Sequence, residues 1–200
     1  MAAMAARHGL MGAHDILEGE VGFGAAMSGQ CDWSKATRGL GEHYNITQMT
    51  FKNHCCCGHI FAPIDGVLQV KKEHRLTHDR IRRVGIASYK AGTDVVANYR
   101  VSSELDARFC APYVVANALR HGSVRLAAFE PERMNDAETR ALMEKIDVAI
   151  DPELDAAFPR QRAARVAIQT RDGRAEEFLQ PTRIGDPDAP LSDAQLDAKF

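Results

Sequence analysis

The chain has 200 residues, of which 45% are hydrophobic and 26% charged, and its formal net charge is −2. This length can bury a core in one large domain or two small ones, and the charge gives no overall attraction to nucleic acid or to an anionic membrane. No apolar run approaches the roughly 18 residues of a membrane span, and the first residues lack a signal-peptide pattern. Five cysteines, three of them adjacent, do not make a disulfide framework, so a cytoplasmic location is predicted.

The first part of the chain predicts little regular structure. An alanine-rich stretch over 2–8 is helical by propensity and ends at Gly9. Asp15 is placed to cap a short helix over 16–20, and the glycine-rich segment 22–29 should follow as a loop. These glycines lack the spacing of a phosphate-binding loop, so we interpret the segment as tight packing rather than a ligand site.

The stretch 47–65, T-Q-M-T-F-K-N-H-C-C-C-G-H-I-F-A-P-I-D, is the centre of the functional prediction. β-branched and aromatic residues over 46–51 predict a short strand, a loop of small residues follows, and helical spacing begins at Ile60. A helix that opens after such a loop presents unpaired N–H groups and the positive end of its dipole, which attract carboxylate or phosphate. Lys52 and His59 flank this loop and are therefore predicted to lie at an anion site.

The rest of the chain predicts alternating helices and strands. The basic run 71–83 lacks interleaved aromatic residues, so we interpret it as a solvated helix end and connector rather than a nucleic-acid patch. Strands are predicted at 84–89, 146–150, 166–170 and 176–180, with a hairpin turn at Asp172-Gly173. A turn at 104–108 capped by Ser102 or Ser103, and helices at 112–121, from Asn135 or Asp136 to 145, and after a Ser192/Gln195 capping box, complete the predicted elements.

The cluster H-C-C-C-G-H at 54–59 admits chemical alternatives to buried small side chains. Zinc is disfavoured because adjacent cysteines rarely bind one metal and no second cysteine pair has finger-like spacing. Cys57 near a helix N-terminus could form a reactive thiolate, although the sequence shows no base within reach. A cysteine-based metal or redox module therefore stays open beside the anion site.

Five blocks of the sequence resemble the MmgE/PrpD family, which includes 2-methylcitrate dehydratase, cis-aconitate decarboxylase and an iminodisuccinate epimerase. The blocks occur in the family's order and cover nearly the whole chain. They are H-D-I-L-E-G-E-V-G-F at 14–23, F-K-N-H-C-C-C-G-H-I-F-A-P-I-D at 51–65, F-C-A-P-Y-V-V-A-N-A-L-R-H-G at 109–122, A-F-P-R-Q-R-A-A-R-V-A-I-Q-T-R-D-G at 157–173, and G-D-P-D-A-P-L-S-D-A-Q-L-D-A-K-F at 185–200.

The resemblance implies an α+β fold, with a mixed or antiparallel sheet and packed helices, that forms a lid over the family's active site. Family proteins are longer and add an all-helical domain made from both chain ends. We therefore expect residues 1–40 to end a helical domain, 41–185 to form the α+β domain, and 186–200 to start the return to the helical domain. The family's helical-domain Asp and His residues would lie before Met1, so this chain alone is expected to be inactive.

The resemblance also implies site residues. The family's active-site lysine falls on Lys52 and its active-site tyrosine on Tyr113, so both are predicted to be catalytic. Many members carry a histidine two positions beyond His59, where this chain has Phe61. The predicted substrate-binding residues are Lys52, Cys57, Gly58 and His59.

The implied activity is a lyase or isomerase reaction next to a carboxylate of a small di- or tricarboxylate: dehydration, decarboxylation or epimerisation. The resemblance implies no metal ion and no organic cofactor, and it suggests a homodimer. The alternative function is a non-catalytic remnant or carboxylate-binding module, which folds without turning a substrate over.

Overall fold

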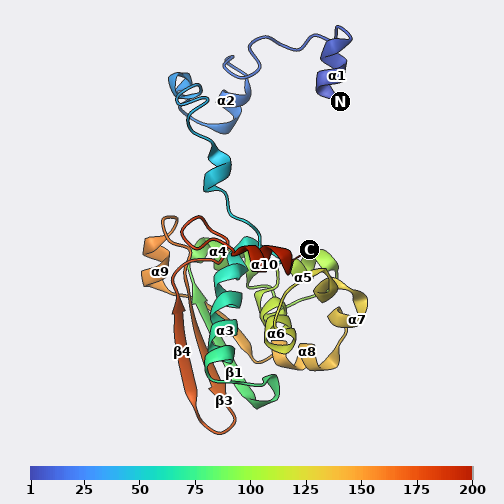
Figure 1. Cartoon of the computed structure of the whole chain (residues 1–200), viewed down its shortest axis with the longest axis vertical. Coiled ribbons are helices and arrows are strands. Elements are labelled where there is room, and N and C mark those ends of the chain that lie inside the picture. Colours follow the sequence, from blue (N-terminus) through green and yellow to red (C-terminus); the bar gives the residue numbers. More distant parts are fainter. Residues whose placement is uncertain (200) are drawn as a thin grey trace. The chain divides into compact units, whose positions relative to one another are not determined.

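The computed structural model describes residues 1–199, and the chain divides into two compact units, Met1–Ile46 and Thr47–Phe200 (Figure 1). The domain boundaries at 40 and 185 come from the family resemblance and stay a prediction. Across the described residues, the helices are all too short or too polar to cross a membrane.

The unit Met1–Ile46 contains α1 (Ala2–Arg7), α2 (Phe23–Met27) and a short 3₁₀ helix, Trp33–Lys35. The helix predicted at 2–8 is confirmed by α1. The helix predicted at 16–20 is wrong, because these residues form turns that are hydrogen-bonded to the segment after them. The prediction of a loop over all of 22–29 is also wrong, because α2 lies within it. Phe23 N–H donates to the carbonyl of Ile16 at 2.7 Å, which commits that carbonyl to the following segment.

The second unit is built on a four-stranded mixed sheet with the order β2-β1-β3-β4. β1 lies parallel to β2 and antiparallel to β3, and β3 lies antiparallel to β4. All four strands predicted after residue 80 are confirmed. Buried residues alternate with more exposed ones along β3 and along β1 from Val84, and the predicted hairpin turn at Asp172-Gly173 leads from β3 into β4. Their bounds are Ile81–Ser88 for β1, Ile146–Ile150 for β2, Ala164–Thr170 for β3 and Ala175–Gln180 for β4.

Two helices, α3 (Phe61–Glu73) and α6 (Ala111–His121), pack against this sheet and against each other (Figure 1). Smaller helices surround them: α4 (Lys90–Val96), α5 (Glu104–Arg108), α7 (Pro131–Met134), α8 (Ala137–Met143), α9 (Pro152–Ala157) and α10 (Asp193–Asp197). Short 3₁₀ helices lie at Asn45–Gln48, Gly58–Ile60, His78–Arg80 and Leu126–Phe129. The α+β fold class is thus confirmed.

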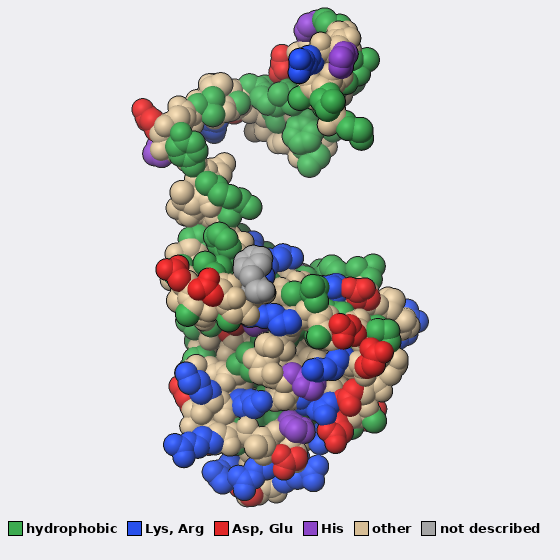
Figure 2. Space-filling model, turned by 45° about the vertical axis from the view of Figure 1, so that its right-hand side comes forward, with side chains coloured by type: hydrophobic (Ala, Val, Ile, Leu, Met, Phe, Trp, Pro, Cys, Tyr) green, Lys and Arg blue, Asp and Glu red, His purple; other side chains and the backbone are tan. Residues whose placement is uncertain are grey.

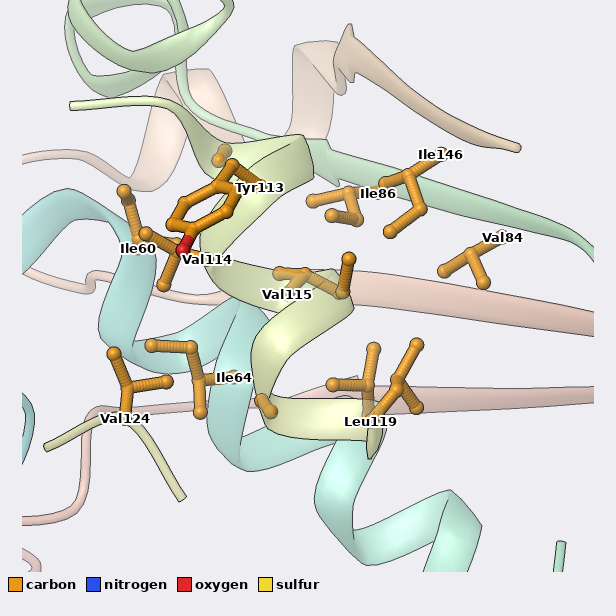
Figure 3. Packing of buried hydrophobic residues seen from close by; sticks show 14 of the residues in the cluster. Ile60, Ile64, Val84, Ile86, Tyr113, Val114, Val115, Leu119, Val124 and Ile146 are labelled. Carbon is orange, nitrogen blue, oxygen red and sulfur yellow. The ribbon is translucent and has the colours of Figure 1, made fainter. Parts of the chain in front are cut away.

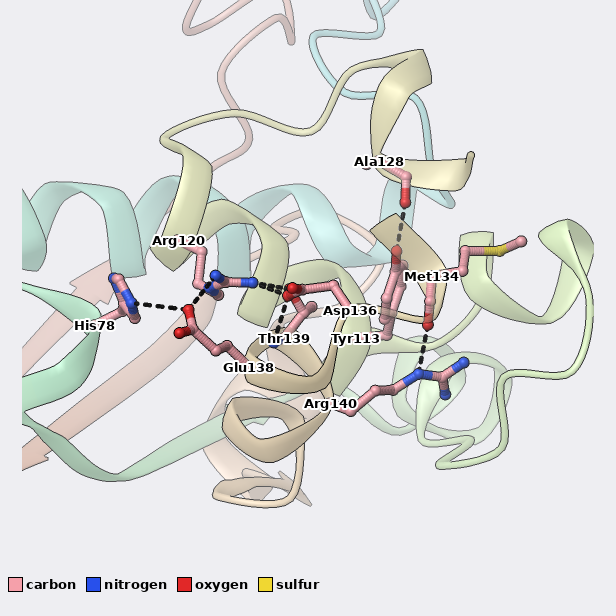
Figure 4. A network of polar contacts seen from close by, with 9 residues as sticks. All are labelled: His78, Tyr113, Arg120, Ala128, Met134, Asp136, Glu138, Thr139 and Arg140. Atoms are coloured by element: carbon pink, nitrogen blue, oxygen red, sulfur yellow. Dashed lines mark hydrogen bonds and ion pairs between the residues drawn. The ribbon is translucent and has the colours of Figure 1, made fainter. Parts of the chain in front are cut away.

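The predicted helix ends are also confirmed. Side chains of Ser103 and Asp136 cap α5 and α8, and Ser192 with Gln195 forms the capping box of α10. Gly122 ends α6 with a φ of 75°, a left-handed conformation that glycine adopts without steric cost. Arg120 of α6 bonds the Asp136 cap and thereby ties α6 to α8 (Figure 4).

The core lies between the sheet and the helices α3 and α6 (Figure 3). Each apolar side chain that is fully buried stabilises the fold by about 1.5–3 kcal/mol relative to exposure, so this interior supplies most of the stability of the unit. The labelled members, each no more than 2% exposed, are Ile60, Ile64, Val84, Ile86, Tyr113, Val114, Val115, Leu119, Val124 and Ile146.

The strand predicted over 46–51 is wrong. Its first residues belong to the 3₁₀ helix Asn45–Gln48, and the rest runs beside the segment around Gly185, whose carbonyl accepts a hydrogen bond from Phe51 N–H at 2.8 Å. Phe51 is 58% exposed, so its side chain does not have the packing against a sheet that makes aromatic residues favourable in strands. Gly185 permits this approach: a Cβ there would lie 2.2 Å from the Phe51 oxygen, and its φ is +106°.

The basic run 71–83 forms the end of α3 and a connector into β1, as predicted. Lys71 Nζ donates to the Leu119 carbonyl at 2.5 Å, and His74 and His78 pair with the carboxylates of Glu176 and Glu138. Basic, acidic and histidine side chains share the face of the unit seen in Figure 2. The run is therefore engaged with its own domain.

Candidate active site

A cleft of about 370 Å³ opens beside Lys52, and we call it the Lys52 cleft. Small-molecule sites commonly have volumes of about 300–1,000 Å³, so the cleft can hold a small ligand. Three of its lining side chains are cationic, which suits an anion. The lining residues are Lys52, His54, Cys55, Cys56, Cys57, Arg108, Phe109, Leu126 and Lys199.

Lys52 is the uncommitted cation of this cleft. Within residues 1–199, its exposed ammonium group has no hydrogen bond or ion pair, whereas Arg108 pairs with Glu104 at 2.5 Å and also bonds the Cys55 carbonyl. Lys199 Nζ donates to the Lys52 carbonyl at 2.8 Å, which brings a second ammonium group to the cleft from the far end of the chain. Among residues 1–199, the unpaired ammonium group of Lys52 is therefore the positive charge that the cleft offers to a ligand.

The backbone N–H groups of Cys55 and Cys57 are hydrogen-bonded within the protein and are therefore not available to bind an anion. The N–H groups of Cys55 and Cys57 donate to the carbonyls of Val124 and Arg108, at 3.1 and 3.0 Å. Cys56 is buried, and burial raises the pKa of its thiol, so it stays a neutral thiol. Cys57 is half-buried and lines the cleft, and its contact with a ligand stays a prediction.

All the cysteines of the chain are free thiols. Over residues 1–199, no three His, Cys, Asp or Glu side chains gather in an arrangement that could hold a metal ion. Cys110 has a structural task that the sequence did not reveal: its Sγ caps α6 by accepting from the N–H of Tyr113 at 3.4 Å, and burial raises its pKa to about 11.

Gly58 and His59 follow the cysteine run and meet a different set of partners. The Gly58 carbonyl accepts a hydrogen bond from Arg183 Nη1 at 3.4 Å, and His59 Nδ1 lies 2.8 Å from the Tyr89 hydroxyl. Burial lowers the pKa of His59 below its usual 6.5, and the positive charges of Arg162 and Arg183 lower it further. His59 is therefore a neutral imidazole at pH 7 and contributes hydrogen bonding rather than charge.

A second, more polar hollow of about 450 Å³ lies beside Arg183, and we call it the Arg183 hollow. Arg183 and Asp186 form a buried ion pair at 2.6 Å, and Thr50 donates to the same carboxylate at 2.5 Å. Burial by itself would raise the pKa of Asp186, but the hydrogen bonds from Arg183 and Thr50 outweigh it and hold the pKa below 3.8. No sequence pattern predicted this pair, although Asp186 lies inside the G-D-P block.

Tyr113 lies behind the wall of the Lys52 cleft rather than in it. The side chain is 0% exposed, its hydroxyl donates to the Ala128 carbonyl (Figure 4), and burial raises its pKa. Its ring lies 6.5 Å from that of Phe129, which in turn lies under the guanidinium of Arg108 at 4.2 Å. The structure thus brings Lys52 and Cys57 together at one cleft and separates Tyr113 from it by one layer of side chains.

The fold and the cleft define a small α+β domain with a cationic site of a size that suits small organic anions. The model of the MmgE/PrpD C-terminal domain matches residues 54–200, and the chain belongs to this family. Cys57, Gly58, His59 and Tyr113 lie inside the matched range, and Lys52 lies just before it.

The chain is similar to the cis-aconitate decarboxylase-like protein oryM of Aspergillus oryzae. The two are 23% identical over 223 residues, which include 99% of this chain and 46% of that protein. The chain therefore spans about half the length of this curated relative.

Proposed function

We propose that this chain supplies the Lys52 side of the active site of a lyase or isomerase that acts on small di- or tricarboxylates. The observation that carries the proposal is the Lys52 cleft, in which an uncommitted ammonium group stands beside Lys199 and Arg108. Family membership and the similarity to a decarboxylase-like protein support this class of reaction.

The chemistry follows from charge. Dehydration, decarboxylation and epimerisation next to a carboxylate all build negative charge on that carboxylate, and fixed cations stabilise such a transition state. In the proposal Lys52 holds the reacting carboxylate, and neither a metal ion nor an organic cofactor is needed. Cys57 contacts the ligand from the cleft wall.

Gly58 and His59 line neither cavity, and they are proposed to bind a second polar group of the substrate beside Arg183, which donates to the Gly58 carbonyl. Gly58 leaves room for Arg183 there, because a Cβ at this position would lie 3.2 Å from Arg183 Nη1. The neutral imidazole of His59, oriented by Tyr89, provides a hydrogen-bonding group.

Tyr113 is proposed to act as a proton donor or hydrogen-bond donor to the intermediate. In the structure its hydroxyl is engaged with Ala128, so this role requires the 3₁₀ helix Leu126–Phe129 to move away from it. Tyr113→Phe should then chiefly lower kcat in the complete enzyme, whereas an effect confined to stability would assign Tyr113 to packing.

The alternative function is a carboxylate-binding module without catalysis. The burial of Tyr113 favours it, because a hydroxyl that is buried and bonded to the Ala128 carbonyl cannot reach a ligand in the cleft to transfer a proton. We also propose that the protein is a homodimer in the cytoplasm. The free thiols support a reducing compartment. Light scattering at several protein concentrations tests the oligomeric state.

Citrate binding measured by calorimetry tests the proposal. The chain should bind citrate saturably, and Lys52→Ala should weaken binding about tenfold or more, because a charge-assisted hydrogen bond contributes about 1.5–3 kcal/mol. Lys72→Ala, at an exposed position near the end of α3, is the matched control. Equal affinities for the wild type and Lys52→Ala would remove Lys52 from the site.

Assays with 2-methylcitrate, cis-aconitate and iminodisuccinate separate the enzyme from the binding module. We expect the 200-residue chain to bind without turnover, and a longer protein that includes a helical half to turn one of these substrates over. Saturable turnover by the 200-residue chain as a monomer would contradict the proposal that its site is shared with a further domain.

A further inference from the structure

His54 is a buried histidine that the proposed function does not use. It lines the Lys52 cleft, it is 5% exposed, and its ring meets that of Phe61 edge to face at 5.3 Å. Apolar packing explains the position of the ring. It does not explain why this residue is a histidine, because both nitrogens of a buried imidazole ring need hydrogen-bond partners.

One of these nitrogens is fixed by Asp65 of α3. His54 Nε2 lies 3.1 Å from Asp65 Oδ1, and the other carboxylate oxygen accepts the N–H of Ile184 at 2.8 Å. The two side chains are only 4% and 2% exposed. An ionised carboxylate only accepts hydrogen bonds, so the pair places the ring proton of a neutral His54 on Nε2.

The other nitrogen, Nδ1, has no hydrogen-bond partner within residues 1–199 although it is buried. A buried polar atom without a partner costs about 1–3 kcal/mol, and such atoms are rare in native structures. With the proton on Nε2, Nδ1 presents a lone pair and needs a donor. His54 already lines the cleft, so a ligand bound there is a natural source of that donor.

The groups that surround the ligand restrict what the donor can be. The charged and titratable side chains that face the cleft with His54 are Lys52, Cys55, Cys56, Cys57, Arg108 and Lys199, with Asp65 behind the ring. The carboxylates of a small polycarboxylate are acceptors at neutral pH and suit the cations. A hydroxyl group on the same ligand is the donor that suits Nδ1.

We propose that His54, held by Asp65, contacts the ligand of the Lys52 cleft through Nδ1 and selects polycarboxylates that carry a hydroxyl group. This inference rests on the proposed function and adds a specificity residue to its site. Asp65 is a positioning residue, because it acts on the ligand only through the tautomer and orientation of His54.

Citrate and tricarballylate, which has the same three carboxylates without the hydroxyl, test the proposal by calorimetry on the 200-residue chain. Citrate should bind about tenfold more tightly, the ratio expected for one hydrogen bond of about 1.4 kcal/mol. His54→Phe keeps an aromatic ring against Phe61 and should reduce this ratio to about one. His74→Phe, at an exposed histidine after α3, should leave the ratio unchanged.

Nitrogen-15 NMR spectra of the histidine rings in the wild-type chain supply a second measurement, which does not depend on whether a variant folds. Free His54 should be the Nε2–H tautomer, and its Nδ1 resonance should move on addition of citrate and not of tricarballylate. Three results would each overturn the inference without contradicting the proposed function. They are equal affinities for the two ligands, a doubly protonated His54, and an Nδ1 resonance that does not shift when citrate is added. Failure of both ligands to bind would overturn both.

Discussion

The two compact units differ most in what their apolar side chains contact. In Met1–Ile46, the side chains of Leu10, Ile16 and Leu17 are 70%, 59% and 52% exposed. In the second unit, Ile64 and Leu119 are 0% exposed and belong to a continuous core. Both units contain helices, so secondary structure alone does not distinguish them.

The comparison separates helix propensity from stability. α1 is alanine-rich and has helical geometry, yet it buries none of its residues. Isolated helices shorter than about 12–15 residues are marginal in water, because nucleation is costly and packing supplies most of the stability. We therefore expect the second unit to carry nearly all of the cooperative unfolding free energy.

The largest expected effect comes from the core. Ile64→Ala should lower the free energy of unfolding by about 2–5 kcal/mol, because it removes a buried side chain and leaves a cavity. Ile16→Ala is the matched change in Met1–Ile46 and should stay within about 0.5 kcal/mol, since the side chain is 59% exposed. Chemical denaturation measures both, and similar losses would show that the first unit has a core of its own.

The next effect comes from ion pairs. Asp186→Asn should cost about 3 kcal/mol, because it leaves Arg183 buried without its charge partner. Asp32 pairs with Lys35 in the first unit at 3.3 Å with both side chains more than half exposed, so Asp32→Asn should not change stability measurably. A comparable loss in both variants would mean that burial does not govern the strength of these pairs.

A smaller effect concerns pH. Since burial lowers the pKa of His59 below 6.5, the folded state binds its proton less readily than the unfolded state. The stability contributed by neutral His59 is present above pH 6.5 and is lost as the pH falls through the lower folded pKa. His59→Gln should flatten the melting temperature against pH in this window, and an unchanged slope would assign it to other groups, such as His121, whose pKa burial also lowers.

The smallest effect should follow removal of residues 1–46. The melting temperature of the remaining chain should change by no more than about 4 °C, which corresponds to about 1 kcal/mol for a domain of this size. Thermal unfolding followed by circular dichroism measures it. A drop well beyond that range would show that the first unit contributes directly to the stability of the second.

Local sequence features determined much of this protein. Alternation predicted three of the strands, a hairpin turn predicted the fourth, and caps at Asp136 and Ser192 predicted helix starts, because these signals depend on residues close together in the chain. The motif blocks indicated the family and led to the prediction, which stays a prediction, that Lys52 and Cys57 belong to the site. Both residues do line the cleft that the structure forms.

Tertiary structure decided what depends on distant partners. The segment 46–51 has β propensity, but no strand of the sheet lies beside it among residues 1–199, and it packs against the segment around Gly185 instead. Tyr113 occupies a first helical turn, as predicted, and the packing of Phe129 and Ala128 over it decides that its hydroxyl is buried. Lys199 reaches the Lys52 carbonyl across 147 positions, and Asp65 holds both His54 and the backbone of Ile184. No local pattern encodes these contacts, because they arise only when separate segments of the chain bury their surfaces against one another.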